Sequence, residues 1–281
     1  TSMFSSTSLG VCIQWTLTVP KRPPSSWFIS VHQKGKCAGC KANIKPKSLM
    51  SSFLQPARYC DYTGLFFCSD CHTNQERVIP GRLVKDFDVI PRKVCDQAAE
   101  FLDQHEQMPL ISVTDMQSKV LEQHGWLRQL TYYRRQWQEL VPILTETGSA
   151  DNCPFWINTK DSQSHIWTCP DVYSMQDLLH LALRETNSTL YVAVRNTISE
   201  ALQHVDNCPK CRVYGKFCCI CSSPHPVYPF DVDAYKECPG GCKQVFHAKC
   251  LARAQQCPIC AAVRRPSVTS KPRRSSFQLA S

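Results

Sequence analysis

Cysteine residues in closely spaced pairs occupy two regions of this chain, and their chemistry is that of metal ligands. The first region supplies one set of candidates: Cys37, Cys40, Cys60, Cys68, Cys71 and His72. The second region supplies another: Cys208, Cys211, Cys218, Cys221, Cys238, Cys242, His247, Cys250, Cys257 and Cys260. Thiolate and imidazole groups in such pairs are the ligands that tetrahedral Zn²⁺ takes in proteins. Two residues between cysteines let one tight turn direct both sulfur atoms at one ion. The sequence therefore predicts that zinc organises both regions.

The total of 19 cysteines in 281 residues fits either a disulfide framework in a secreted protein or a reduced zinc protein. The local C-x2-C pairs favour zinc, because disulfide frameworks rarely show them. The chain does not open with the basic start and apolar run of a signal peptide. It also lacks a run of about eighteen apolar residues, the length that spans a membrane. We therefore expect a reduced, intracellular protein.

The order of the ligand pairs in the second region predicts two interleaved sites. In cross-braced zinc modules, the first and third pairs share one ion, and the second and fourth pairs share another. This rule gives one site of Cys218, Cys221, His247 and Cys250, and one of Cys238, Cys242, Cys257 and Cys260. Cys219 is an alternative to Cys218, but only Cys218 keeps the C-x2-C spacing with Cys221. Neither half of an interleaved module is expected to fold alone.

The other candidates make two further sites, so we expect about four Zn²⁺ ions. One site consists of Cys37, Cys40, Cys68 and Cys71, and the other of Cys60, His72, Cys208 and Cys211. The second of these would link the two regions; in the alternative interpretation, Cys60 is simply buried and His72 has a surface role. Four protein ligands for each ion leave no open position for water, which is typical of structural zinc. We expect no catalytic residue, and Cys12, Cys95, Cys153 and Cys169 are expected to be buried or neutral thiols.

Composition divides the chain into five segments. We expect a Ser- and Pro-rich linker or N-terminal extension (1–35), an N-terminal zinc module (36–90), a helical segment (91–207), a C-terminal zinc module (208–263) and a disordered basic tail (264–281). Trp15, Trp27 and Phe28 are apolar enough to pack onto the domain as a short strand.

Four helices are predicted in the middle of the chain. The first is opened by Pro91, the second is capped by Thr114, the third by Ser174 with Asp177 near its positive end, and the fourth by Ser188. The second helix carries a stripe of apolar residues at helical spacing, which we interpret as packed core: Val120, Leu127, Leu130, Trp137, Leu140 and Leu144. The segment 148–170 lacks such a period and is predicted to be a loop.

The formal net charge of +9 raises the question of nucleic-acid binding. Thiolates bound to zinc offset much of this charge, and several of the remaining cations lie in the tail, at Arg264, Arg265, Lys271, Arg273 and Arg274. We therefore expect no nucleic-acid partner. The sequence gives no indication of the oligomeric state.

The order of the motifs resembles the Rubicon-homology domain family. The matching motifs are Lys36-Cys37-x2-Cys40, Arg58-Tyr59-Cys60-Asp61-Tyr62-Thr63-Gly64, Phe67-Cys68-x2-Cys71-His72, Val78-Ile79-Pro80-Gly81-Arg82, Val172-Tyr173-Ser174, Cys208-x2-Cys211, Tyr228-Pro229-Phe230-Asp231, Phe246-His247-x2-Cys250 and Cys257-Pro258-x-Cys260. The resemblance covers residues 36–263. Cys219 and the three residues between Cys238 and Cys242 depart from the family pattern.

This resemblance implies an adaptor rather than an enzyme. Members of the family bind the GTP-loaded form of the Rab GTPase of late endosomes and lysosomes. The implied location is cytoplasmic and peripheral on late endosomes, lysosomes and autophagosomes, with a role in autophagy and endosome–lysosome trafficking. The expected fold class is α-helical with small zinc-finger modules, in which a helical middle segment is flanked by cross-braced zinc clusters similar to FYVE and PHD modules.

Two other functions compete with this one. Cys257-Pro258-Ile259-Cys260 is similar to part of a RING finger, which would make the chain a ubiquitin ligase. However, a RING has a further ligand pair soon after the His-containing pair, and Leu251-Ala252-Arg253 follows Cys250 here. Arg58-Tyr59-Cys60 resembles part of a phosphoinositide-binding FYVE domain, so a weak contact with phosphoinositide membranes, through Arg58 or the tail, is also expected. A zinc module that only separates other domains is the remaining alternative.

Overall fold

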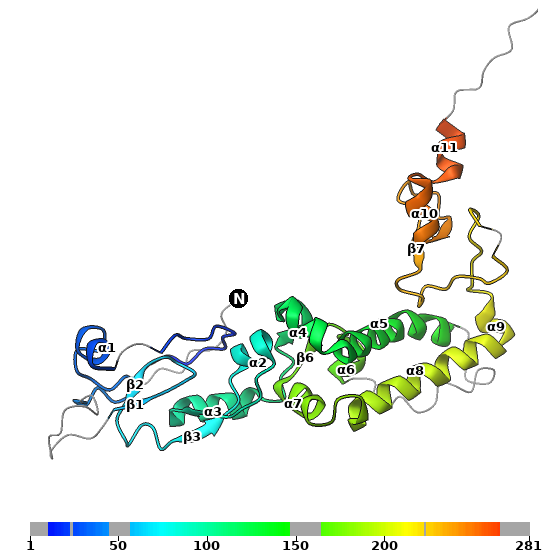
Figure 1. Ribbon diagram of the computed structural model, residues 1–281. Helices are drawn as coiled ribbons and strands as arrows, with labels where there is room; N and C mark the ends of the chain where they lie inside the picture. Colours follow the sequence, from blue (N-terminus) through cyan, green and yellow to red (C-terminus); the bar gives the residue numbers. More distant parts are fainter. Residues whose placement is uncertain (1–10, 23–24, 45–56, 147–163, 222, 265–281) are drawn as a thin grey trace, which may run out of the picture. The chain divides into compact units, whose positions relative to one another are not determined.

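The computed structural model describes residues 11–22, 25–44, 57–146, 164–221 and 223–264 (Figure 1). In this part of the chain, α-helices are the main elements, and the strands form four two-stranded antiparallel sheets. The backbone contacts divide the chain into two units. Unit 1 comprises residues 1–138 and 157–202, and unit 2 comprises residues 139–156 and 203–281. None of the described helices is both long and apolar enough to cross a membrane.

Unit 1 contains three of the sheets, formed by the pairs β1–β2, β3–β4 and β5–β6. It also contains most of helices α5 and α8, whose last turns belong to unit 2. Its elements are α1 (Ser25–Val31), β1 (Arg58–Tyr59), β2 (Phe66–Phe67), β3 (Gln75–Arg77), α2 (Pro80–Asp86), β4 (Arg92–Val94), α3 (Asp96–His105), β5 (Ile111–Ser112), η1 (Val113–Asp115), α4 (Ser118–Gln123), α5 (Gly125–Glu146), α6 (His165–Thr168), β6 (Val172–Tyr173), α7 (Met175–Arg184), η3 (Glu185–Asn187) and α8 (Thr189–Asn207).

The segment predicted as a linker contributes to the core of unit 1. Ile13 and Ile29 are buried in the same apolar cluster as Phe67, and Trp15 packs against that cluster. The phenol of Tyr62 donates a hydrogen bond to the carbonyl of Gln14 at 2.7 Å. Trp27 and Phe28 lie in helix α1 and not in the predicted strand. Burial of apolar side chains on one side of this short helix accounts for its packing onto the domain.

The helix predicted to open at Pro91 begins later. Arg92–Val94 form strand β4, which pairs with β3 so that Gln75 lies opposite Val94. Helix α3 then begins at Asp96, with extended Cys95 as its N-cap. Strand β3, which pairs with β4, lies outside the local sequence on which the helix prediction rested. Pairing with β3 therefore makes residues 92–94 a strand, although their local sequence favours a helix.

The second predicted helix is divided into α4 and α5. Thr114 does not cap either of them, because it lies in η1, whose N-cap is Ser112. The apolar stripe of the prediction is nevertheless core, since Val120, Leu127, Leu130, Trp137, Leu140 and Leu144 are all buried. Trp137 also contacts Trp167, with ring centroids 5.1 Å apart.

The caps of the third and fourth predicted helices are confirmed. The hydroxyl of Ser174 accepts a hydrogen bond from the Asp177 backbone amide at 3.1 Å, and the Asp177 carboxylate accepts one from the Ser174 amide at 2.8 Å. This reciprocal capping box satisfies two amides that the helix itself leaves free. The hydroxyl of Ser188 likewise accepts from the Tyr191 amide at the start of α8. Most of the segment 148–170 lies outside the described residues, and α6 is its described helix.

Unit 2 contains the fourth sheet, in which β7 pairs with β8. Besides the last turns of α5 and α8, its described elements are α9 (Pro209–Arg212), β7 (Tyr235–Glu237), β8 (Val245–His247), α10 (Ala248–Ala254) and α11 (Pro258–Arg264). Its small buried cluster consists of Phe246 together with the thiols Cys218, Cys238 and Cys257. Burial at this site is thus contributed largely by cysteine side chains, and a core of this size gives little hydrophobic stabilisation.

Candidate metal centres

In the part of the chain that the structure describes, four groups of cysteine and histidine side chains are positioned to hold metal ions. The ligand atoms within each group lie within 4.8 Å of one another. The groups are Cys37–Cys40–Cys68–Cys71, Cys218–Cys221–His247–Cys250, Cys238–Cys242–Cys257–Cys260 and His204–Cys208–Cys211. The first lies in unit 1 and the other three lie in unit 2. In three of the groups the structure brings together the residues that sequence spacing predicted.

The distances between ligand atoms fit a bound zinc ion. The sulfur atoms of Cys40 and Cys68 are 3.5 Å apart, and those of Cys238 and Cys260 are 3.6 Å apart. A disulfide would require about 2.05 Å. Four thiolates at about 2.3 Å from one tetrahedral ion lie ~3.8 Å from each other. The thiols are therefore arranged as ligands around a common point and not as disulfide partners.

In unit 1, two short turns bring the ligands of the first group together. One turn carries Cys37 and Cys40, and the other follows β2 and carries Cys68 and Cys71. The amide of Cys68 donates a hydrogen bond to the sulfur of Cys37 at 3.3 Å, which stabilises negative charge on that sulfur. A side chain at Gly39 would crowd this group, because its Cβ would lie 3.0 Å from the Cys71 sulfur.

In unit 2, the two four-residue groups alternate along the chain. His247 ends β8 and its Nδ1 atom lies 3.3 Å from the sulfur of Cys221. Cys257 immediately precedes α11, and its sulfur lies 3.6 Å from that of Cys242. Each group therefore draws one ligand pair from before β8 and one from β8 or beyond, as the cross-brace rule predicted. The groups contain Cys218 and not Cys219, whose side chain is exposed.

The additional residue between Cys238 and Cys242 is accommodated by glycine. Gly241 has a φ of +79°, a conformation that is strained for residues with a side chain. The amide of Gly240 donates a hydrogen bond to the sulfur of Cys238 at 3.2 Å. A Cβ atom at Gly240 would lie 3.0 Å from the sulfur of Cys260. The glycine pair thus keeps both sulfur atoms directed at the same point.

The fourth group differs from the prediction, which paired Cys208 and Cys211 with Cys60 and His72. Cys208 and Cys211 lie with His204, whose Nε2 atom is 3.4 Å from the Cys211 sulfur. His204 lies in the last turn of α8, Cys208 is the N-cap of α9, and Cys211 lies in α9. The spacing of four residues between His204 and Cys208 is one helical turn. That spacing is visible in the sequence, where His204 stands four residues before the pair Cys208-x2-Cys211.

The two residues that were predicted to join this group, Cys60 and His72, have other contacts in unit 1. His72 is fully buried, its Nε2 atom lies 3.1 Å from the Tyr59 carbonyl, and its Nδ1 atom accepts a hydrogen bond from the Asn74 amide at 3.2 Å. Both ring nitrogens are therefore engaged by the backbone. The thiol of Cys60 forms a hydrogen bond with that of Cys95, which lowers the pKa of Cys60 to about 6 and raises that of Cys95.

The thiols of the metal groups differ in acidity. Burial opposes ionisation of Cys238, but hydrogen bonds from Cys242 and the Gly240 amide lower its pKa to about 6. The pKa of Cys260 is raised to about 12, chiefly because of its hydrogen bond with Cys238. Cys218 likewise has a pKa lowered to about 6, because backbone amides near His247 and Ile220 outweigh the effect of burial. Cys218 and Cys238 therefore each offer a thiolate to an incoming cation near neutral pH.

The remaining cysteines, which were expected to be buried or neutral thiols, differ in exposure. Cys95 is buried, but Cys12 and Cys169 are exposed. Cys153 lies outside the residues that the structure describes. Arg58, considered as a lipid contact, donates a hydrogen bond to the His72 carbonyl at 2.5 Å. Its guanidinium is therefore held against the domain by that contact.

Comparison with known proteins confirms the family that the motif order resembles. The chain belongs to the Rubicon Homology Domain family, whose model matches residues 58–265.

Among curated proteins, the chain is 28% identical over 262 residues to "Protein associated with UVRAG as autophagy enhancer" from Mus musculus, an alignment that covers 92% of this chain and 38% of that protein. It is 29% identical over 230 residues to "Pleckstrin homology domain-containing family M member 3" from Xenopus laevis, covering 81% of this chain and 29% of that protein. The Homo sapiens protein of the same name is 28% identical over 232 residues. The chain thus spans only about a third of the length of these relatives.

Proposed function

We propose that this chain is a zinc-stabilised adaptor domain that acts in autophagy and in endosome–lysosome trafficking. The observation that carries the proposal is membership of the Rubicon Homology Domain family over residues 58–265. One relative is named as an autophagy enhancer, which supports the same process for this chain. The partner implied by the family resemblance is the Rab GTPase of late endosomes and lysosomes in its GTP-loaded form. The chain would then be a peripheral protein on the cytoplasmic side of those organelles.

Zinc is proposed as the ion in all four groups, because ligand sets made of cysteine and histidine are those that Zn²⁺ prefers. Three groups offer four protein ligands each, which closes a tetrahedral site and favours a structural role. The interleaved groups of unit 2 would form a cross-braced module similar to FYVE and PHD modules. An ion held by His204, Cys208 and Cys211 takes one further ligand. Zinc would thus supply the stability that the small cluster around Phe246 does not.

This chain would distinguish the two nucleotide states of the Rab GTPase by contacting the switch segments of the GTPase, which the γ-phosphate of GTP orders. We expect the zinc-loaded chain to bind the late-endosomal Rab loaded with a GTP analogue at least about tenfold more tightly than the GDP form. Isothermal titration with both nucleotide states measures this ratio. Equal affinity for the two forms, or no binding to either while zinc is retained, would contradict the proposed partner.

Two cysteine variants separate loss of fold from loss of a contact. Cys218→Ser removes a ligand of an interleaved group in unit 2, so we expect partial loss of zinc, partial loss of helical circular dichroism and loss of Rab binding together. Cys219→Ser changes the adjacent exposed thiol, which lies outside the group. It should retain zinc, fold and binding. If both variants bound the Rab as the unmodified chain does, zinc would not support the binding surface.

The ligase and lipid alternatives have direct assays. We propose that the chain does not transfer ubiquitin, so self-modification in the presence of a conjugating enzyme should be absent. We also propose a weak contact with phosphoinositide membranes. Arg58 is held by the His72 carbonyl, so this contact should depend on the basic residues of the tail. Sedimentation with phosphoinositide liposomes, with and without residues 265–281, tests that dependence.

A further inference from the structure

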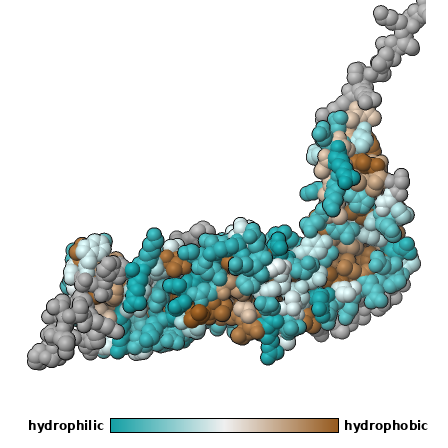
Figure 2. All heavy atoms as spheres, in the orientation of Figure 1, coloured by the Kyte–Doolittle hydropathy of each residue, from teal (hydrophilic) through white to brown (hydrophobic). Residues whose placement is uncertain are grey.

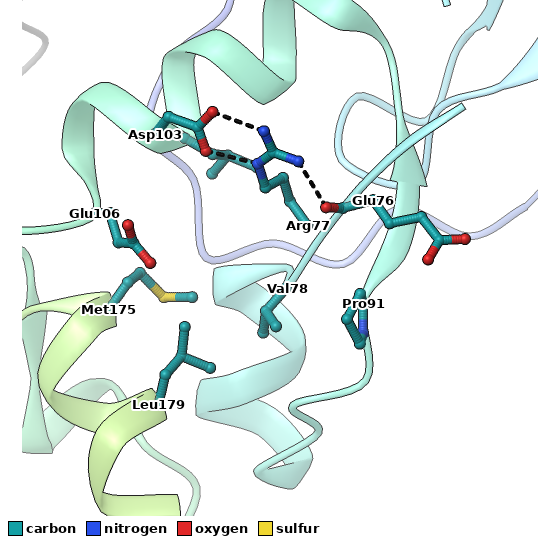
Figure 3. A pocket seen from close by; sticks show the side chains of 9 residues that line it. Glu76, Arg77, Val78, Pro91, Asp103, Glu106, Met175 and Leu179 are labelled. Atoms are coloured by element: carbon teal, nitrogen blue, oxygen red, sulfur yellow. Dashed lines mark hydrogen bonds and ion pairs between the residues drawn. The ribbon is translucent and has the colours of Figure 1, made fainter. Parts of the chain in front are cut away.

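Unit 1 contains an open pocket of about 200 Å³ bounded by β3, α3, α7 and the residue before β4 (Figure 3). Its walls carry both apolar and charged side chains: Glu76, Arg77, Val78, Pro91, Leu102, Asp103, Glu106, Met175 and Leu179. In Figure 3, Val78 extends from the strand side, and Met175 and Leu179 extend from α7 towards the same space. None of these lining residues belongs to a metal group, so metal binding does not account for the pocket.

The pocket has a fixed wall. The guanidinium of Arg77 donates two hydrogen bonds to the carboxylate of Asp103, from Nε at 2.6 Å and from Nη2 at 2.7 Å. Its Nη1 atom donates to the Glu76 carbonyl at 2.8 Å. A bidentate pair fixes both side chains in one plane. Leu102 and Met175 are buried, so the apolar base is supported by the surrounding fold, and a ligand does not have to order it.

The apolar side of the pocket continues along α7 to an exposed leucine. Met175, Leu179 and Leu183 are spaced four residues apart, so they lie on one face of that helix. The side chain of Leu183 is 80% exposed. On the face shown in Figure 2, the surface is mainly hydrophilic, and apolar side chains form only small patches. An open pocket that continues into an exposed leucine suits a segment of another protein, whereas small molecules take more enclosed sites.

The charged side chains around the pocket are mostly acidic. Glu76, Asp103 and Glu106 are three carboxylates, and the only cation in the pocket wall, Arg77, is paired with Asp103. Within the described residues, Glu76 and Glu106 form no salt bridge. Lys93 lies opposite Glu76 across the β3–β4 pair, but it does not line the pocket. The pocket therefore combines an apolar interior with a net negative border, which attracts cations.

We propose that this pocket binds a segment of a partner protein in which one large apolar side chain is flanked by lysine or arginine. The apolar side chain lies between Val78, Met175 and Leu179, and the flanking cations lie beside Glu76 and Glu106. An apolar cavity of about 150 Å³ can accept a benzene ring, so the pocket has room for a phenylalanine ring. The formal net charge of the chain is +9, so the acidic border, and not the charge of the whole molecule, supplies the attraction. This partner is additional to the proposed Rab GTPase.

The test uses the zinc-loaded full chain and three fluorescent peptides, without any GTPase. The reference peptide has the core Lys-Arg-Phe-Arg-Lys, the second has alanine in place of the phenylalanine, and the third has glutamine in place of each cation. Fluorescence anisotropy should show saturable binding of the reference peptide that weakens with added salt. The alanine peptide should bind about tenfold or more weakly, because burial of the ring is lost. The glutamine peptide should also bind about tenfold more weakly, because it loses the attraction to the acidic border.

Variants of the pocket complete the test. Glu106→Lys reverses an exposed charge at its border and should weaken binding of the reference peptide about three- to tenfold. Glu106 is the C-cap of α3, where a cation is compatible with the helix dipole, so this variant should retain zinc and circular dichroism. Glu122→Lys makes the same change on α4, outside the pocket, and should leave the affinity unchanged. No binding of the reference peptide, equal binding of the alanine or glutamine peptide, or equal weakening by the two variants would overturn the proposal.

Discussion

His72 and His204 compete for the role of the second histidine ligand, and the contacts of their ring nitrogens separate them. Both nitrogens of His72 contact backbone groups, whereas Nε2 of His204 faces the Cys211 sulfur. We therefore expect His204→Ala to remove about one zinc ion per chain. His72→Ala should retain the full zinc content and lower the free energy of unfolding, because it leaves a buried cavity and an unpaired carbonyl.

Elemental analysis of the two purified variants measures this difference. Loss of an ion from His72→Ala, together with an unchanged content in His204→Ala, would restore the ligand set that spacing alone suggested. The sequence contained the information needed for His204, since a histidine four residues before a C-x2-C pair can share its helical face. It did not contain the contacts of His72, because Tyr59 reaches that ring through the pairing of β1 with β2.

Thiol acidity gives the metal groups a dependence on pH. At pH 7, Cys238 is mainly a thiolate because its pKa is lowered to about 6, while Cys260 is protonated because its pKa is raised to about 12. The pKa of Cys242 is also raised. Zinc must therefore displace at least the protons of Cys242 and Cys260, so zinc affinity of this group should rise with pH, by about 100-fold per unit near pH 7. Chelator competition between pH 6 and 8 measures the slope, and an affinity independent of pH would contradict this assignment.

Among the elements, α5, α6 and β6 are joined by one buried cation. Arg134 in α5 is almost fully buried and donates hydrogen bonds to the carbonyls of Ile166 at 2.7 Å, Cys169 at 2.7 Å and Val172 at 3.0 Å. Its guanidinium also lies 4.3 Å from the centre of the Tyr173 ring. Lysine keeps the charge but lacks the planar fork that serves several carbonyls. We expect Arg134→Lys to lower the free energy of unfolding by roughly 2–4 kcal/mol.

Arg135, the adjacent residue, is the matched control for this prediction. It forms an ion pair with Asp171, and its side chain is half exposed. Arg135→Lys should therefore cost less than about 1 kcal/mol. Urea unfolding of both zinc-loaded variants gives the comparison. Equal losses in the two variants would mean that the carbonyl contacts of Arg134 do not hold α6 and β6.

The elements that could be predicted from sequence are those specified by local signals. Ser174 with Asp177, and Ser188, marked the starts of α7 and α8 correctly because caps act within one turn. Arg92–Val94 was predicted as helix, since its strand character arises from pairing with Gln75–Arg77 far back in the chain. The burial of Ile13 was missed for a similar reason. Its core partners come from segments that are distant in the sequence.

At the scale of the whole chain, the metal groups were more predictable than the packing. Fixed spacing between cysteines is a local property, and the interleaved order of pairs in unit 2 left one arrangement consistent with a cross-brace. The residues that pack together into each unit could not be predicted from local spacing, because their contacts join segments that are distant in the sequence. Unit 1 combines the first metal group with most of the helices, whereas the prediction separated residues 36–90 from 91–207.

The central claim is that four metal ions organise this chain, and native mass spectrometry of the protein purified with zinc tests it most directly. The account predicts a mass that corresponds to four bound Zn²⁺ ions. It further predicts that a chelator removes the ions together with the helical circular dichroism. A metal-free folded chain, or a denatured mass lowered by the hydrogen atoms lost in disulfide bonds between these cysteines, would contradict the account.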